Sequence, residues 1–390
     1  MDGRGGRSVV VVGAGIVGAA SAYFLAQRGF RVRLIEAEAP AAAASGAADG
    51  AVSVASKRPG PMMTTALAGI ALYRQLEREG LFSGLFKPRP TVMVAEDESE
   101  VESLTGHADA LAGEGMALRR IEGEALRRYL PDVSTGVRLA IEVGNEGHAI
   151  GYEIVRRLIA ASGVAVERDT TVLGLVAGAS GRSVAAVATS RGPVEADQFV
   201  IAAGGGTADL IGLSGVVRPR KGQLAVTERA SALNAALPGA LMSCRYLLSK
   251  DAIAGAAGTA ARRFGLVVDP LRTGQFLIGG TREETADTGN DLAAIRHMLG
   301  SAVRLLPPLA RLRVIRVFSG VRSATRDGLP LIGRMPGRDN LFVATGFEGD
   351  GICLGPLVGQ AVGRIVAGEP SDLDLQPFAP GRFAQRSLVA

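Results

Sequence analysis

Three glycines and one glutamate near the start of the chain have the clearest chemical meaning. Gly13, Gly15 and Gly18 follow an apolar run at residues 9–12, and Glu36 ends the next apolar run. In a strand–turn–helix–strand unit, such glycines permit a tight turn, a close approach of the backbone to a pyrophosphate, and close packing of the helix on the strand. The N-terminus of the helix then attracts phosphate, and a carboxylate at the position of Glu36 accepts a hydrogen bond from a ribose hydroxyl. The pattern predicts a dinucleotide site for FAD or NAD, because Glu36 would repel the 2′-phosphate of NADP.

Few other side chains could carry out catalysis. His107, His148 and His297 are the only histidines in the 390 residues, and Cys244 and Cys353 are the only cysteines. Their spacing fits neither a metal site nor a Ser-His-Asp triad, and it provides no disulfide framework. The net charge of +5 is spread without a dense basic block, which argues against nucleic acid as a partner. We therefore expect no metal site, and we expect a bound cofactor to perform the difficult chemistry.

The uncharged stretch at residues 9–27 has a second interpretation, as a signal peptide or a membrane span. We reject it because three glycines interrupt the apolar run, Arg28 follows directly, and cleavage would remove the nucleotide site. No other stretch is long and apolar enough to span a bilayer. The sequence predicts a cytoplasmic protein without membrane insertion.

The periodicity of the rest of the chain predicts the elements that must position this site. Helices are expected at residues 64–79, 98–112, 122–129, 154–161 and 351–366, and strands at residues 91–95, 164–166, 171–176, 184–189, 199–203 and 341–346. Strands dominate between residues 222 and 318, including one at residues 246–248, with one helix near residues 291–306. Residues 41–50 are small and too flexible for a core strand, while the glycines at 204–206 form either a tight turn or a second place where backbone approaches a nucleotide.

Four motifs follow one another along the chain. They are the glycine motif with Glu36, residues 220–223, residues 320–322 leading into 327–333, and residues 344–346 before a helix. In this order they resemble the D-amino acid oxidase and glycine oxidase family of FAD-dependent amine oxidoreductases, over essentially the full length of the chain. Each motif alone is modest evidence, but the four in order are specific.

The resemblance implies an α/β fold with an α+β second domain. A Rossmann-like FAD-binding domain would comprise residues 1–85, 150–215 and 325–390, and a discontinuous antiparallel-sheet substrate domain would comprise residues 86–149 and 216–324. A helix that begins near Gly351 would direct its positive N-terminal end at the flavin N1 and C2 carbonyl, where negative charge accumulates on reduction. The residues expected to bind FAD are Gly13, Gly15, Ile16, Val17, Gly18, Glu36, Ala37, Ser45, Gly46, Val172, Ala203, Gly204, Gly346, Gly349, Gly351 and Ile352.

Within this family, residues 245–250, 279–283 and 346–351 look most like the flavin subunits of multisubunit bacterial dehydrogenases. This group contains the β subunits of D-hydroxyproline and proline dehydrogenases, the B subunits of opine oxidases, and a hydrogen cyanide synthase subunit. The resemblance implies an α subunit and a small iron–sulfur subunit as partners, and it leaves open an FMN at a subunit interface. His148 precedes a helix near which related sarcosine oxidase β subunits attach a second flavin, but the local match is poor and we do not expect a covalent flavin there.

The resemblance also implies the reaction, which is oxidation of the C–N bond of an amino acid, imino acid or opine by hydride transfer to flavin N5, giving an imine. Arg322 lies where the family has its carboxylate-binding arginine, although Ser323 replaces the proline that follows that arginine. The alternative for Arg322 is a structural arginine at the surface or at an interface. The second carboxylate-binding arginine of simple glycine oxidases would fall near Gly349, where this chain has none. Tyr246 is the second candidate for the substrate site, where it would close the pocket or bind the substrate carboxylate, with simple packing as the alternative.

Two other functions remain open at this level. The chain could be a stand-alone oxidase that produces hydrogen peroxide, or a flavin-bearing scaffold that relays electrons beside an α subunit. Lys57, Lys221 and Lys250 are further candidates, because any of them could lie beside the isoalloxazine and tune it, although a solvated position is the ordinary interpretation for each.

Overall fold

The computed structural model describes residues 6–248 and 262–384, and these residues form two large and two small sheets with helices between them. The first large sheet has the strand order β19-β20-β13-β1-β2-β9, and all its neighbours are parallel except the edge strand β19. Its strands are β1 (Ser8–Val12), β2 (Arg31–Ile35), β9 (Val166–Glu167), β13 (Gln198–Ile201), β19 (Leu331–Arg334) and β20 (Leu341–Thr345). The four valines of β1 are fully or almost fully buried, as expected for a parallel strand covered on both faces.

Helix α1 (Ile16–Ala26) connects β1 to β2 and packs on α10 (Gly351–Ala367) and α5 (Gly151–Ser162). Three glycines of α10 at intervals of four residues make this contact close. A Cβ atom added at Gly355 would lie 2.8 Å from Ile16, and one added at Gly359 would lie 2.4 Å from the Cβ of Ala20. On the other side of α10, helix α2 (Pro61–Arg78) contributes Tyr73, whose hydroxyl donates a hydrogen bond to the Ile352 carbonyl at 2.8 Å. The start of α10 is thus fixed between α1 and α2.

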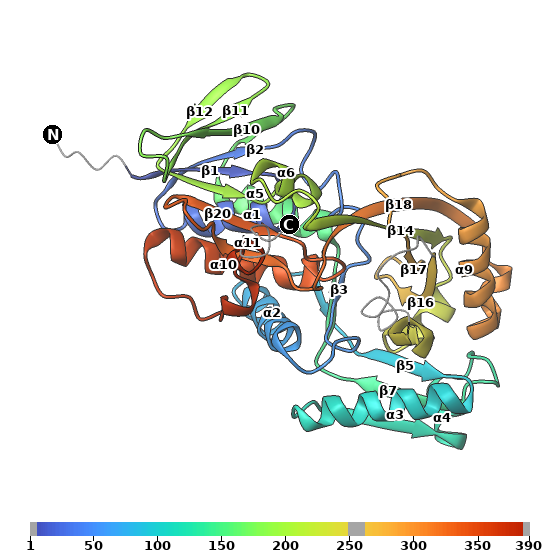
Figure 1. Cartoon of the computed structure of the whole chain (residues 1–390). Helices are drawn as coiled ribbons and strands as arrows, with labels where there is room; N and C mark the ends of the chain where they lie inside the picture. The colour runs from blue at the N-terminus through green and yellow to red at the C-terminus, as the bar shows by residue number, and fades with distance from the viewer. Residues whose placement is uncertain (1–5, 249–261, 385–390) are drawn as a thin grey trace.

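The second large sheet has eight strands in the order β18-β14-β17-β16-β15-β5-β7-β6. Its strands are β5 (Thr91–Ala95), β6 (Leu118–Glu122), β7 (Leu139–Val143), β14 (Val217–Thr227), β15 (Ala240–Ser243), β16 (Arg263–Pro270), β17 (Phe276–Arg282) and β18 (Val314–Thr325). The sheet is antiparallel except where β15 pairs with β5. In Figure 1 this sheet and α9 (Leu292–Leu305) lie to the right of the six-stranded sheet, with α3 (Glu98–Gly113) and α4 (Gly123–Tyr129) below. The α/β fold class predicted from the sequence is confirmed.

Smaller elements complete the described chain. One antiparallel sheet contains β10 (Val172–Ala177), β11 (Val184–Thr189) and β12 (Gly192–Glu195), and another contains β3 (Ala51–Val52), β8 (Gly147–Ala149) and β4 (Phe86–Pro88). The short helices are α6 (Thr207–Leu210), α7 (Ser231–Ala236), α11 (Gly381–Ala384) and the 3-10 turns at Gly204–Gly206, Pro307–Arg311 and Gln376–Phe378. The strand expected at residues 246–248 is wrong, because residues 244–248 are helical directly after β15. This apolar run contains no β-branched residue, and leucine favours helix.

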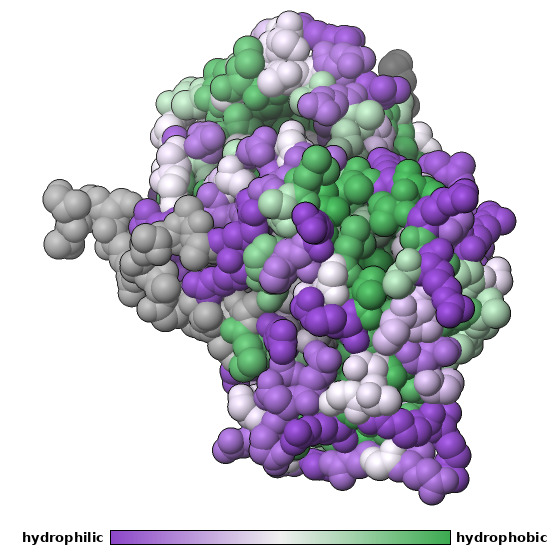
Figure 2. All heavy atoms as spheres, turned by 90° about the vertical axis from the view of Figure 1, so that its right-hand side faces the viewer, coloured by the Kyte–Doolittle hydropathy of each residue, from purple (hydrophilic) through white to green (hydrophobic). Residues whose placement is uncertain are grey.

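The face of the molecule that carries α9 shows a band of hydrophobic side chains between hydrophilic borders (Figure 2). Large hydrophobic residues exposed on α9 and on β18 are Leu292, Val314 and Ile315. Strand β18 forms an edge of its sheet, so one of its sides has no neighbouring strand in the described residues. No helix within residues 6–248 and 262–384 is long and apolar enough to cross a membrane.

The contact between α1 and α10 provides a stability test. Replacing Gly359 by Ala would place a methyl group 2.6 Å from the Ala20 carbonyl carbon, so the two helices must separate. We expect the free energy of unfolding to fall by about 1–3 kcal/mol. The control is Gly106→Ala in the exposed part of α3, where an added Cβ meets nothing within 4 Å. This control should raise the free energy of unfolding by about 0.5–1 kcal/mol in guanidinium denaturation. Equal effects of both changes would contradict the close contact.

Candidate active site

A cavity of about 670 Å³ lies between the two large sheets. One wall contains the carboxyl ends of β1, β2, β13 and β20, and the opposite wall contains β14, β16, β17 and β18. Parallel α/β sheets bind ligands at the carboxyl ends of their strands, and the volume is within the range of ligand pockets in proteins. The cavity is therefore the candidate binding site.

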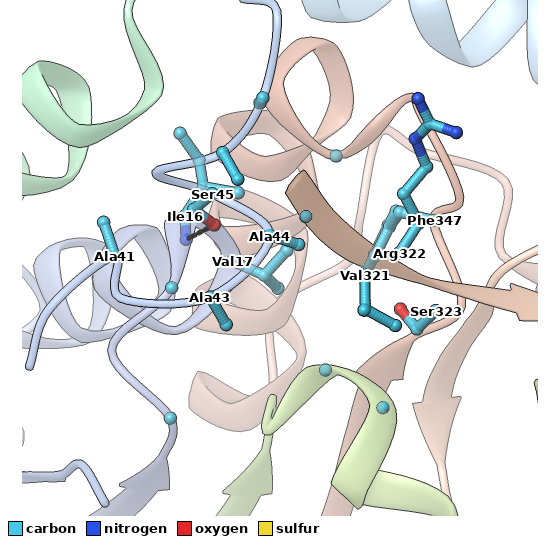
Figure 3. A pocket seen from close by; sticks show the side chains of 18 of the residues that line it. Ile16, Val17, Ala41, Ala43, Ala44, Ser45, Val321, Arg322, Ser323 and Phe347 are labelled. Atoms are coloured by element: carbon cyan, nitrogen blue, oxygen red, sulfur yellow. Dashed lines mark hydrogen bonds between the residues drawn. The ribbon is translucent and has the colours of Figure 1, made fainter. Parts of the chain in front are cut away.

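The glycine motif forms one end of this cavity. Gly13 has a φ of +98°, and a Cβ added there would lie 2.5 Å from the Ala202 carbonyl oxygen, so only glycine fits the turn. A Cβ at Gly18 would lie 1.8 Å from the Gly13 carbonyl oxygen, so α1 packs directly on the turn. Ser45 Oγ accepts a hydrogen bond from the Ile16 N–H at 3.0 Å, the dashed line in Figure 3. The first turn of α1 is thus held in place at the edge of the cavity.

Glu36 lies beside this turn, at the end of β2. Its Oε2 accepts a hydrogen bond from the Ala14 N–H at 2.7 Å, and its Oε1 accepts one from the Glu38 N–H at 3.0 Å. Glu36 also lines the cavity. A carboxylate offers about four lone-pair sites, so these two bonds leave capacity for the hydroxyls of a ribose.

Residues 41–49 form an arch of small side chains over the cavity. Ala41, Ala42, Ala43, Ala44, Ser45, Ala47, Ala48 and Asp49 line the cavity. The arch is tied to the glycine turn by a hydrogen bond of 3.1 Å from the Ala41 N–H to the Ala14 carbonyl. A Cβ added at Gly46 would lie 2.2 Å from the Ala41 carbonyl oxygen, so the arch also packs closely on itself. Its small residues let the backbone come near a ligand.

Glycines of the eight-stranded sheet allow close packing at the opposite wall. Gly222, Gly279, Gly280 and Gly320 line the cavity, and a Cβ at Gly320 would lie 2.6 Å from the Cβ of Ala47. The guanidinium of Arg322 extends over Gly222, where an added Cβ would lie 2.6 Å from its Nη2. Figure 3 shows Arg322 on the opposite side of the pocket from Ile16, Ala43 and Ser45. Nη1 of Arg322 is buried and has no hydrogen-bond partner among the described residues.

The loop from β20 to α10 forms the wall next to Arg322. Thr345, Phe347, Glu348, Gly349, Gly351 and Ile352 line the cavity there. Glu348 Oε1 lies 3.3 Å from Arg220 Nη1 and 3.4 Å from Arg282 Nε. Arg282 is almost fully buried, and its guanidinium lies over the ring of Tyr246 at 4.5 Å from the ring centre. Tyr246 itself lines the cavity. This part of the site is therefore a network of charges and one aromatic ring.

The structure brings most of the residues predicted from the sequence to the cavity wall. Those at the wall are Gly13, Gly15, Ile16, Val17, Glu36, Ala37, Ser45, Val172, Ala203, Gly204, Tyr246, Arg322, Gly349, Gly351 and Ile352. Gly18, Gly46 and Gly346 are not at the wall. Gly18 and Gly46 serve the close packing described above, and Gly346 has a φ of +81° with Thr325 Cγ2 2.5 Å from where its Cβ would be. These three glycines shape the backbone that does reach the cavity.

The sequence interpretation did not identify the alanines of the arch or the glycines of the eight-stranded sheet as site residues. The small-residue stretch at 41–50 was the available signal for the arch, and it indicated only flexibility. The glycines of β14, β17 and β18 lie in the motifs at residues 220–223, 279–283 and 320–322, but those motifs indicated the family and not a position at the cavity wall.

The lysine and histidine candidates within the described residues lie outside the wall. Lys57 pairs with Asp350 at 2.5 Å and Lys221 with Asp287 at 2.8 Å, while Lys250 is outside the described residues. His148 Nε2 lies 3.0 Å from the Asp49 carbonyl oxygen. Burial lowers the pKa of His148 below its ordinary value. The described residues contain no group of three or more His, Cys, Asp or Glu side chains that could hold a metal ion.

The fold and the cavity together define a protein that binds a dinucleotide at the carboxyl edge of a Rossmann-like sheet. Residues 8–365 match the family described as FAD dependent oxidoreductase, and the chain belongs to this family. It is therefore an enzyme that uses FAD. The observations that fit this cofactor are the glycine turn against α1, Glu36 at the end of β2, and a cavity that continues from there to the start of α10.

The chain is similar to relatives over nearly its whole length. It is 29% identical over 386 residues to glycine oxidase from Geobacillus kaustophilus, covering 95% of this chain and 96% of that protein. It is 28% identical over 429 residues to hydrogen cyanide synthase subunit HcnC from Pseudomonas protegens, covering 96% of both. The crystal structure of glycine oxidase from Geobacillus kaustophilus superposes with a TM-score of 0.83 at 26% identity, covering 96% of this chain and 98% of that one. These findings confirm the family expected from the sequence.

The position of Glu36 makes its contribution to FAD binding measurable. In Glu36→Ala, the Ala14 N–H loses its carboxylate partner, and a ribose hydroxyl of FAD would lose its expected acceptor. A hydrogen bond to a charged group contributes roughly 1.5–3 kcal/mol, so FAD affinity should fall by roughly 10- to 100-fold. Titration of the apoprotein with FAD, followed by flavin fluorescence, measures this change. Glu195→Ala, at an exposed position of β12, is the matched control and should bind FAD like the unchanged protein. Unchanged affinity of Glu36→Ala would disprove the assignment.

Proposed function

We propose that this enzyme oxidises the C–N bond of an amino acid, an imino acid or an opine, giving an imine that water hydrolyses. The observation that carries the proposal is Arg322, whose guanidinium lies over Gly222 at the cavity wall with a buried Nη1 that lacks a partner among the described residues. A planar guanidinium binds a carboxylate through two parallel hydrogen bonds, which fixes the orientation of the substrate. The names of the relatives support this substrate class, since one is a glycine oxidase.

Bound FAD would supply the hydride acceptor. Gly13, Gly15, Glu36 and Ser45 would hold its nucleotide part, and the start of α10 would face its pyrimidine ring. The chain itself has to orient the substrate, because neither Arg322 nor Tyr246 is suited to act as a base at neutral pH. The substrate amine has to be neutral when the C–H bond breaks, and orientation then supplies much of the rate.

The wall around Arg322 favours a substrate larger than glycine. Gly349 lies where the resemblance to glycine oxidases places a second arginine, so a second carboxylate anchor is missing at that position. The cavity of about 670 Å³ continues past Arg322 along the eight-stranded sheet. A substituent on the amine nitrogen or on Cα would occupy this part of the cavity, with Tyr246 at its border.

The role of Arg322 can be tested by replacing it with methionine. Loss of two charge-assisted hydrogen bonds should lower kcat/KM by roughly 100-fold, while FAD stays bound. Anaerobic mixing with D- and L-amino acids, proline, hydroxyproline, sarcosine and opines, followed by flavin absorbance, identifies the substrate and measures the loss. Arg316→Met changes an exposed arginine on the same strand and should have no effect. Equal activity of the two variants would remove Arg322 from the substrate site.

We also propose that the chain works as the flavin subunit of a multisubunit dehydrogenase, with an α subunit and a small iron–sulfur subunit. The similarity to a hydrogen cyanide synthase subunit supports this, as do the exposed hydrophobic residues Leu292, Val314 and Ile315 beside the edge strand β18. An FMN at the subunit interface remains part of this proposal, as does a cytoplasmic location.

This subunit proposal predicts the behaviour of the isolated chain towards oxygen. After anaerobic reduction by substrate, admission of air should reoxidise the flavin slowly, because the natural acceptor is the missing partner. A stable and active monomer in gel filtration, with rapid reoxidation and hydrogen peroxide production, would instead identify a stand-alone oxidase. Bound flavin that no substrate reduces until an α subunit is added would indicate an electron-relay scaffold.

A further inference from the structure

Both acidic residues of the loop between β20 and α10 are paired with cations. Glu348 contacts Arg220 and Arg282, as described above, and Asp350 Oδ1 lies 2.5 Å from Lys57 Nζ. Between them, Gly349 reaches the cavity wall, and Gly351 and Ile352 continue that wall into the first turn of α10. The loop therefore presents backbone to the cavity, while its two carboxylates are each held by cations.

Lys57 comes from a distant part of the chain. It lies between β3 and α2, and its side chain is only 5% exposed. Burial lowers the pKa of Lys57, but the ion pair and hydrogen bond with Asp350, together with Cys353 and Tyr246 nearby, raise this pKa above its ordinary value. Lys57 is therefore charged at neutral pH, and neither Lys57 nor Asp350 lines the cavity. This pair lies behind the wall that the start of α10 forms.

The charge of Asp350 affects the electrostatic potential at the start of α10, because Asp350 directly precedes this helix. Its carbonyl accepts a hydrogen bond from the Leu354 N–H at 3.0 Å, so it belongs to the first turn of the helix. The N-terminus of a helix carries a partial positive charge of about half an elementary charge. An unpaired carboxylate at the same place would cancel this positive potential, and Lys57 prevents that by neutralising Asp350.

A flavin gains negative charge when it is reduced, so charges near its pyrimidine ring alter its reduction potential. We propose that Lys57 is a positioning residue that pairs with Asp350 and thereby sets the reduction potential of the flavin through the start of α10. This inference rests on the proposed function in one respect, which is that the start of α10 faces the pyrimidine ring of FAD.

The decisive test is the midpoint potential of the bound FAD in five variants. Lys57→Met removes the ion-pair partner of Asp350 and should make reduction harder, whereas Asp350→Asn removes the ion-pair partner of Lys57 and should make reduction easier. One uncompensated charge at this end of the cavity should change the reduction equilibrium by roughly tenfold. Tenfold corresponds to about 30 mV for a two-electron couple. The double variant Lys57→Met/Asp350→Asn should return towards the unchanged protein.

Lys221→Met is the matched control, because Lys221 is also a buried lysine paired with an aspartate but does not line the cavity or contact this loop pair. Lys221→Met should leave the midpoint potential unchanged. Lys57→Arg keeps a positive charge beside Asp350 and should have the midpoint potential of the unchanged protein. Shifts of the same sign in Lys57→Met and Asp350→Asn, or an equal shift in Lys221→Met, would overturn the inference. If Lys57→Met does not fold, the positive shift in Asp350→Asn and its cancellation in the double variant still decide the question.

The potential titration uses a dye and an artificial reductant, so it is independent of the substrate. Midpoint potentials that shift in opposite directions in Lys57→Met and Asp350→Asn would support the inference. If kcat/KM of Arg322→Met were also unchanged, the proposed substrate site would be refuted. If Arg322→Met lost activity as expected but the two midpoint potentials did not shift in opposite directions, the inference would be refuted and the proposed function would remain.

Discussion

The turn between β1 and α1 imposes a steric constraint on which the site depends, because several distant segments approach it without intervening side chains. Gly18 lies on the carbonyl of Gly13, and Ala202 donates its N–H to the Val12 carbonyl at 2.8 Å. The arch at residues 41–49 bonds to Ala14, and α10 packs its glycines on α1. Since α1 is nearly buried on all sides, a larger residue at any of these contacts would separate two walls of the cavity. The shape of the cavity therefore depends on the close packing of α1 against its neighbours.

The parts of the fold that could be predicted from the sequence are those whose signal is local. The valines of β1, the glycine turn and Glu36 lie within 28 residues, and hydrophobic periodicity sufficed to place α2, α3 and β5 to within a few residues. The strand predicted at residues 246–248 was wrong, because an apolar run of three residues does not distinguish a strand from a helical turn. The arrangement of the two large sheets depends on contacts between distant segments, and only the resemblance to a family indicated it.

The candidate site also contains residues with a signal in the sequence and residues whose contacts depend on distant segments. Arg322 was identified through the order of motifs and not from its own surroundings, since nothing in the sequence shows that its guanidinium lies over Gly222. The Lys57–Asp350 pair joins residues 293 positions apart, so no spacing rule could predict it. Such pairs depend on burial and on the path of the whole chain, which a single sequence does not reveal.

The charges near the loop at residues 346–351 distinguish Arg322 from the other arginines around the cavity. Arg220 and Arg282 share Glu348, Arg220 also pairs with Glu284 at 2.6 Å, and Lys57 pairs with Asp350. Removing these charges from water is costly, and the carboxylates compensate the cost. Arg322 lies over a glycine and keeps a buried Nη1 without a partner among the described residues. We propose that a carboxylate entering the cavity binds Arg322, since its hydrogen-bonding capacity is incompletely used among the described residues. The paired cations hold the loop that forms the neighbouring wall.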